Sequence, residues 1–122
     1  MPNIKALRIE PGTTPIETCL GTSLKELQAA VDGYIEMVPL DKACNILCNE
    51  EGKLKGLTPN RLFGSDVIAG RFFVVKVDDD GELTDLNDGD ISKYYEMFKT
   101  PLTEAQTEYY DRILSIGSVK LK

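Results

Sequence analysis

The sequence predicts that residues 1–122 form a single α+β domain. Its mainly antiparallel sheet should have five or six strands, with one helix after the second strand and two helices at the C-terminus. The length is that of one domain, and short β-prone runs separated by glycine, proline and polar turns fill most of the chain before residue 87. Apolar residues repeat at helical spacing once early and twice near the end. We expect the helices to cover one sheet face.

The N-terminal half is expected to contain one helix among four strands. Ser23 and Glu26 form a capping box at the start of an apolar repeat, so the helix should begin there. It should end at Asp32, with Gly33 as its C-cap glycine. The four strands are expected at residues 4–9, 15–20, 34–40 and 43–48.

The next segment should contain the centre of the sheet. Residues 54–66 include Gly56, Pro59 and Gly64, which are typical of a loop. The continuous apolar run at 72–75 then predicts a strand over 67–77 that is buried on both faces. A turn at 80–81 should return the chain as an edge strand over 82–86.

Two helices are expected to complete the domain. Asn87 or Asp88 can cap a helix over residues 90–99. Thr100 and Pro101 are typical of a cap and a first helical residue, so a last helix should run from there to about residue 115. Residues 116–122 are expected to be a frayed tail.

The amino-acid composition excludes several chemistries. The chain has no histidine, which excludes a histidine base, a Ser-His or Cys-His nucleophile pair and any histidine-containing metal site. Cys19, Cys44 and Cys48 are too few for a structural zinc site, and their odd number argues against a disulfide framework. Cys44 and Cys48 fall in an apolar stretch, where core packing is expected. We predict neither a cofactor nor a metal.

The net charge of −6 comes from one acidic segment, which we define as residues 78–90. It holds seven acids and no base, whereas the rest of the chain is close to neutral. A calcium loop of the EF-hand type would place Lys76 at the first ligand position, so we favour a solvated hairpin tip instead. An acidic protein is unsuited to nucleic-acid backbones and to anionic membranes. Without an apolar run of signal-peptide or membrane-helix length, we expect a cytoplasmic protein.

Three polar residues are candidates for binding a ligand: Asn49, Asn60 and Arg61. They bracket a glycine-containing loop that leads to the central strand, and function concentrates on such loops. The guanidinium of Arg61 matches a carboxylate or phosphate, as in a nucleotide, and Asn60 can read an amide or a base edge. The alternative is turn chemistry, with Asn60 bonded to the local backbone and Arg61 in a salt bridge.

Aromatic doublets in the last two helices are candidates for binding a partner. Both members of the pairs at 94–95 and 109–110 cannot easily face one core, so Tyr95 and Tyr110 are the candidates. The alternative is that these aromatic residues pack the helices on the sheet.

The segments 4–12, 33–40, 48–61 and 68–70 together resemble the domain of unknown function family 3846. Members are small proteins found largely in Firmicutes and in their phages, plasmids and integrative elements. The resemblance covers roughly residues 4–98, and the last helix lies outside it. It implies a mobile genetic element or its host as the context, and it implies no activity. Asn49, Gly52, Asn60 and Arg61 stand in its longest signature, so the resemblance adds Gly52 to the candidates for binding a ligand.

These observations predict a protein that is not an enzyme. The leading hypothesis is a binding or protein-interaction domain that serves a mobile element by engaging a host or element protein. A DNA mimic is one version, although the near-neutral remainder of the chain argues against it. The alternative is a protein that binds a small molecule, such as a nucleotide or another anion. Oligomeric state and strand order stay open.

Overall fold

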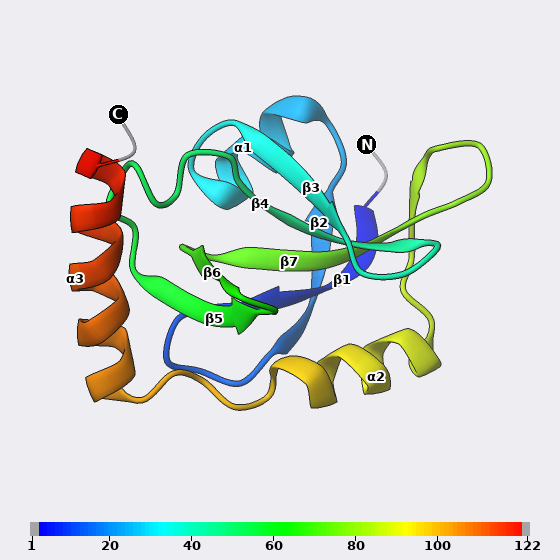
Figure 1. Ribbon diagram of the computed structural model, residues 1–122. Coiled ribbons are helices and arrows are strands. Elements are labelled where there is room, and N and C mark those ends of the chain that lie inside the picture. Colours follow the sequence, from blue (N-terminus) through cyan, green and yellow to red (C-terminus); the bar gives the residue numbers. More distant parts are fainter. Residues whose placement is uncertain (1–2, 121–122) are drawn as a thin grey trace.

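The protein's structure, a computed structural model, describes residues 3–120, and for residues 116–120 only their backbone. It confirms an α+β fold with an antiparallel sheet, one helix after the second strand and two C-terminal helices (Figure 1). The strands are β1 (Asn3–Ile9), β2 (Ile16–Gly21), β3 (Ile35–Pro39), β4 (Cys44–Asn49), β5 (Pro59–Phe63), β6 (Asp66–Ala69), β7 (Phe72–Val77) and β8 (Leu83–Thr84). The helices are α1 (Leu24–Val31), α2 (Asp88–Phe98) and α3 (Glu104–Lys120). No described helix is both long and apolar enough to span a membrane.

The main sheet has the order β2-β1-β7-β4-β3, and β8 pairs with the end of β7. The pairings are antiparallel, with Leu7 opposite Val74 and Ile46 also opposite Val74. The run at 72–75 is fully buried at the centre of this sheet, as predicted. Two segments distant in sequence, β1 and β4, therefore flank β7, and β3 is left at one edge of the sheet.

Each face of the sheet has its own apolar core. Because side chains alternate along a strand, Cys44, Ile46 and Cys48 pack on one face and Leu47 on the other. The first face is covered by α2 through Tyr94 and Phe98, together with the β5–β6 hairpin. The other face is covered by α1 through Leu27 and Val31. The prediction that the helices share one face is therefore wrong, because apolar residues alternate on both sides of the central strands and each side needs a cover.

Local capping fixes the ends of α1 and α2. Ser23 and Glu26 form the predicted capping box, and Asn87 caps α2 in the same way with Asp90. At the end of α1, Asp32 takes the left-handed conformation (φ 63°) that we expected at Gly33. Gly33 is needed for another reason, since an added Cβ would lie 2.7 Å from Nδ2 of Asn49.

The predicted loop over 54–66 is wrong, because much of it forms the β5–β6 hairpin. Pro59 is the first residue of its strand, where a missing N–H costs little, and Gly64 (φ 62°) makes the turn. The single strand predicted over 67–77 is also divided into β6 and β7. Gly70 (φ 88°) turns the chain between the hairpin and the main sheet.

The last helix differs from its prediction at both ends. Thr100 and Pro101 precede it, and Thr103 caps it instead by accepting a hydrogen bond from N of Gln106, while Gln106 bonds back to N of Thr103. The helix continues past residue 115 to Lys120, and residues 121–122 of the expected tail lie outside the described residues. In Figure 1, α3 stands at one side of the molecule, next to β5.

Candidate functional site

Asn60, at the start of the hairpin, is fully buried, with 0% of its surface exposed. Its Nδ2 donates to the carbonyl oxygens of Ile9 and Gly70, both at 2.8 Å. Its Oδ1 accepts from a guanidinium nitrogen of Arg61 at 2.8 Å. The amide therefore fastens β5 to the end of β1 and to the turn before β7, which is the work of a structural anchor.

Arg61 is buried beside it, with 3% of its surface exposed. Its Nε donates to the carbonyl of Phe98 at 2.8 Å, and its terminal nitrogens donate to the carbonyls of Thr13 and Glu10 and to Asn60. Burial lowers the pKa of this guanidinium, although an arginine still stays charged. Arg61 thus binds backbone oxygens in place of the expected salt bridge, and it ties the β1–β2 loop and the end of α2 to the hairpin. Its fork is not open to an anion.

Asn49 and Gly52 hold the turn that leaves β4. Nδ2 of Asn49 donates to the carbonyl of Val31 at 2.9 Å, and its Oδ1 accepts from N of Glu51 at 2.7 Å. A Cβ on Gly52 would lie 2.5 Å from the carbonyl oxygen of Ala69, so only glycine lets the turn approach β6 this closely. These two candidates border a cavity, whereas Asn60 and Arg61 do not.

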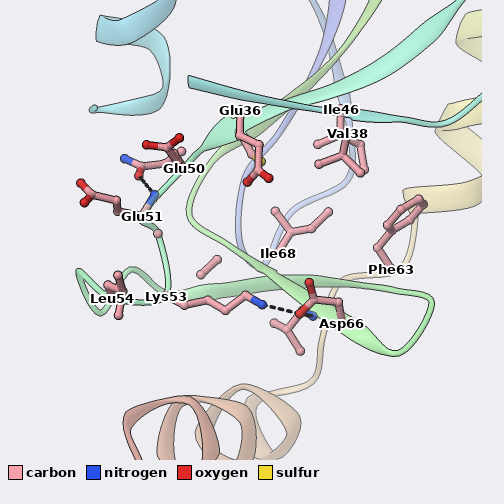
Figure 2. A pocket seen from close by; sticks show the side chains of 15 residues that line it. Glu36, Val38, Ile46, Glu50, Glu51, Lys53, Leu54, Phe63, Asp66 and Ile68 are labelled. Carbon is pink, nitrogen blue, oxygen red and sulfur yellow. Dashed lines mark hydrogen bonds and ion pairs between the residues drawn. The ribbon is translucent and has the colours of Figure 1, made fainter. Parts of the chain in front are cut away.

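This cavity has a volume of about 400 Å³ and lies between the main sheet and the hairpin. We call it the hairpin pocket. Its apolar wall comes from β3, β4, β6 and the residues around the turns: Val38, Ile46, Cys48, Leu54, Phe63, Val67, Ile68 and Ala69. In Figure 2, Ile68 points from the hairpin toward the side of the pocket formed by Val38 and Ile46. The size lies within the range of pockets that hold small ligands or single side chains.

Acidic side chains surround the hairpin pocket. Glu36, Glu50, Glu51 and Asp66 line it together with one base, Lys53, which forms an ion pair with Asp66, while Glu51 pairs with Lys55 outside the lining at 3.9 Å. That ion pair lowers the pKa of Asp66 against the opposing effect of burial. In Figure 2, the carboxylate of Glu36 points into the pocket. Among the described residues, Glu36 has no ion-pair partner within 4 Å. The rim therefore favours a positive charge and repels anions.

The thiol of Cys48 lies in the wall of this pocket. Burial, together with the charges of Glu36 and Asp66, raises its pKa to about 11. A thiol with this pKa is protonated at neutral pH, so Cys48 is neither a thiolate nucleophile nor a ready metal ligand. Over the described residues, no three Cys, Asp or Glu side chains gather in a way that would hold a metal ion.

A second polar cluster joins α2 to the loop before β4. The hydroxyl of Tyr94 donates to Asp41, whose carboxylate also accepts from N of Ala43 and N of Cys44, both at 2.8 Å. The hydrogen bond from Tyr94 and these two backbone bonds lower the pKa of Asp41 to about 2. Burial and Asp41 together raise the pKa of Tyr94. This cluster is closed on itself, so it serves the packing of α2.

The two tyrosine candidates belong to different surfaces. Tyr95 is exposed on α2 while its neighbour Tyr94 is buried, which agrees with the argument that both cannot face one core. Tyr110 is half-buried on α3, where its ring meets that of Tyr109 edge to face at 5.1 Å. Because α2 and α3 run along different sides of the molecule in Figure 1, the structure does not gather Tyr95 and Tyr110 into one patch.

Part of the acidic segment is used by the fold. Asp78 accepts hydrogen bonds from N of Asp80 and N of Glu82 in the hairpin turn. Asp85 accepts from N of Lys5, and Asp90 forms an ion pair with Lys76 at 2.9 Å. The predicted hairpin tip thus describes residues 78–82 alone, because Asp85 is bonded to β1 and Asp90 belongs to α2.

Apart from Asn49 and Gly52, the sequence argument missed the residues that make the pocket. Glu36 offered the available signal, since it is an acid inside a β-prone segment, but its orientation depends on the pairing of β3 with β4. Phe63 and Ile68 were assigned to a loop and to a long central strand. Their common position in the pocket follows only from the hairpin.

Comparison with known proteins identifies one family. The sequence model described as "Domain of unknown function (DUF3846)" matches residues 4–99. This range contains every residue of the hairpin pocket and ends before α3. No curated protein and no solved structure matches the chain.

Proposed function

Because the chain belongs to the DUF3846 family, whose description assigns no activity, we propose its function from the geometry alone. We propose a non-enzymatic binding domain whose hairpin pocket receives an apolar group that carries, or lies beside, a positive charge. One observation carries this proposal: a cavity of about 400 Å³ with an apolar wall and four acids against one base. Apolar contact supplies affinity in such a site, and the charges supply selectivity.

The chemistry of the side chains also supports a binding role. Both buried thiols, Cys44 and Cys48, have pKa values raised to about 11 by burial, and no histidine is present as a base. The carboxylates at the rim are solvated, which does not favour acid–base catalysis. We do not propose the nucleotide or anion ligand that the sequence suggested, because Asn60 and Arg61 are bonded to the backbone and the rim is acidic. A cytoplasmic location and service to a mobile element stay predictions.

The test uses three probes with the same eight-carbon tail: octylamine, octanol and octanoate, each below its micelle concentration. Amide chemical shifts of the ¹⁵N-labelled protein are followed during titration. We expect shifts at Cys48, Gly52 and Ile68, with affinity decreasing from the amine to the alcohol to the carboxylate. Equal affinity for all three probes would contradict the role of the rim, and no shift with any probe would contradict the pocket.

Two variants of the hairpin control this experiment. Ile68→Trp fills the pocket from within, because Ile68 lines it. Leu62→Trp adds the same side chain on the same hairpin at an exposed position outside the pocket. We expect octylamine binding to be lost in Ile68→Trp and kept in Leu62→Trp. Retained binding in both variants would place the probe elsewhere and reject the proposal.

A further inference from the structure

Strand β3 leaves one edge of the main sheet open. In the sheet order of the described residues it is the last strand and pairs with β4 alone. Its flanking hydrogen bonds fix which backbone groups face outward. N of Glu50 donates to the carbonyl of Tyr34 at 2.8 Å, and N of Leu40 donates to the carbonyl of Cys44 at 2.9 Å. Since hydrogen-bonded positions alternate in an antiparallel pair, the even-numbered residues of β3 face β4.

The odd-numbered residues therefore present their backbone groups away from the sheet. Ile35 and Met37 each offer an N–H and a carbonyl, and Pro39 offers a carbonyl alone. Met37 is exposed and Ile35 half-buried, so the edge is accessible. Proline at the end limits pairing to a short segment, which also discourages open-ended sheet growth.

This open edge adjoins the hairpin pocket. Side chains of β3 alternate between the two faces, and Glu36 and Val38 lie on the face that lines the pocket. A strand added at about 4.8 Å beyond β3 would place every second side chain on that same face. Such a side chain would lie over the pocket, and its neighbour two residues along would lie near the acidic rim.

We propose that the occupant is an extended segment of another protein, which adds to β3 and carries an apolar residue two positions from a lysine or arginine. The inference rests on the proposed function of the pocket. The outward N–H and carbonyl groups favour a peptide over a simple amine, because only a peptide can satisfy them in register. The carboxylate of Glu36, which has no ion-pair partner among the described residues, favours a basic side chain together with Glu50.

A second copy of this chain fits the edge less well. Pairing β3 with β3 of another molecule would bring two acidic rims together, each with a Glu36 that points toward its own pocket. Like charges across neighbouring strands are destabilising. The acidic rim thus selects against self-association and for a basic partner.

The test uses a capped seven-residue peptide in which lysine, leucine and valine alternate with threonine. Its binding to the full chain is measured by calorimetry and by amide chemical shifts. We expect shifts and slower hydrogen exchange at Ile35 and Met37. Replacing the lysine by glutamate should weaken binding by at least about tenfold. Shifts at the β2 edge alone, or equal binding of both peptides, would overturn the inference.

N-methylated peptides test strand addition without changing the protein. Methyl groups on alternate peptide nitrogens block the edge that pairs with β3 in one set and the outer edge in the other. The set that is methylated on the edge that pairs with β3 should lose at least about tenfold in affinity, and the set that is methylated on the outer edge should bind as the parent peptide does. Equal behaviour of the two sets would overturn strand addition.

A protein variant completes the design. Met37→Pro removes an outward N–H and leaves the β3–β4 hydrogen bonds in place, since the backbone N–H and carbonyl of Met37 point away from β4. We expect it to bind the peptide at least about tenfold more weakly while it still binds octylamine. If octylamine binds the native chain and the peptide does not, strand addition fails and the pocket proposal stands. If neither binds, both fail.

Discussion

The two strands of the β5–β6 hairpin use polar residues in opposite ways. On β5, Asn60 and Arg61 are buried, and their polar atoms are bonded to backbone carbonyls of β1, the β1–β2 loop, the turn before β7 and the end of α2. On β6, around Asp66 and Ile68, the hairpin borders a cavity whose acid from β3, Glu36, lacks an ion-pair partner among the described residues. The difference shows that an unusual polar residue in a loop-like sequence can hold segments of the fold together through hydrogen bonds to the backbone, and need not contact a ligand. A binding site is indicated by polar atoms that are not already bonded within the protein, and not by the presence of polar residues alone.

The sharpest way to break this comparison is Arg61→Ala. The change leaves the buried carbonyl of Phe98, the partly buried carbonyl of Thr13 and the Oδ1 of Asn60 without their donor. We expect the free energy of unfolding to fall by about 3–5 kcal/mol, because several hydrogen bonds to a charged group are lost together. Urea unfolding measures it, with Arg112→Ala on the exposed surface of α3 as a control that should change little. A loss under about 1 kcal/mol would free Arg61 for another role.

Asn60→Asp tests the same anchor with almost no change of shape. A carboxylate cannot donate, so the carbonyls of Ile9 and Gly70 would face a buried oxygen in place of Nδ2. We expect a loss of about 2–3 kcal/mol in urea unfolding. The matched control is Asn45→Asp, because Asn45 is half-buried and makes a longer bond of 3.3 Å to the carbonyl of Ala43. Equal losses in the two variants would contradict a special role for Asn60.

The sequence predicted the elements that depend on local rules. The capping box at Ser23 and the buried apolar run at 72–75 follow from local sequence alone, and both are present. The β5–β6 hairpin was missed because Pro59 and Gly64 are typical of loops. Proline is also allowed at the start of a strand, and glycine is allowed in a hairpin turn. Whether these residues form a loop or a hairpin therefore depends on where the strands begin and end, which the local sequence does not specify.

The candidate residues show the same limit. Asn49, Asn60 and Arg61 were singled out because of their chemistry and Gly52 because of the family resemblance, and the structure gives each a specific contact. No local rule states whether a buried amide faces a ligand or the carbonyl of Ile9, which is 51 residues away. The pocket joins β3 to β6 through a turn that Gly52 brings against Ala69, so its existence depends on tertiary packing.

Asp41 is an acid that is hydrogen-bonded within the fold, in contrast to Glu36 in the hairpin pocket. Its folded pKa of about 2 lies below the usual value near 4, so it stabilises the fold above the unfolded pKa. That contribution is lost as the pH falls through the folded pKa of about 2. Because the side chain is partly exposed, we expect only about 1 kcal/mol. Thermal unfolding between pH 7 and pH 2 measures it, and the native chain should lose more stability than Asp41→Asn over that range. Parallel profiles would contradict the assignment.

Glu36→Gln should have the smallest effect on stability and is the other half of the comparison. The carboxylate points into the hairpin pocket, it has no ion-pair partner among the described residues, and Asp66 and Glu50 line the same pocket. Neutralising it removes repulsion and breaks no contact, so the free energy of unfolding should stay within about 0.5 kcal/mol or rise slightly. Urea unfolding beside Arg61→Ala measures this difference. A loss above about 1 kcal/mol would mean that Glu36, like Arg61, stabilises the fold through contacts of its own. Its carboxylate would then not be available to attract a positively charged ligand.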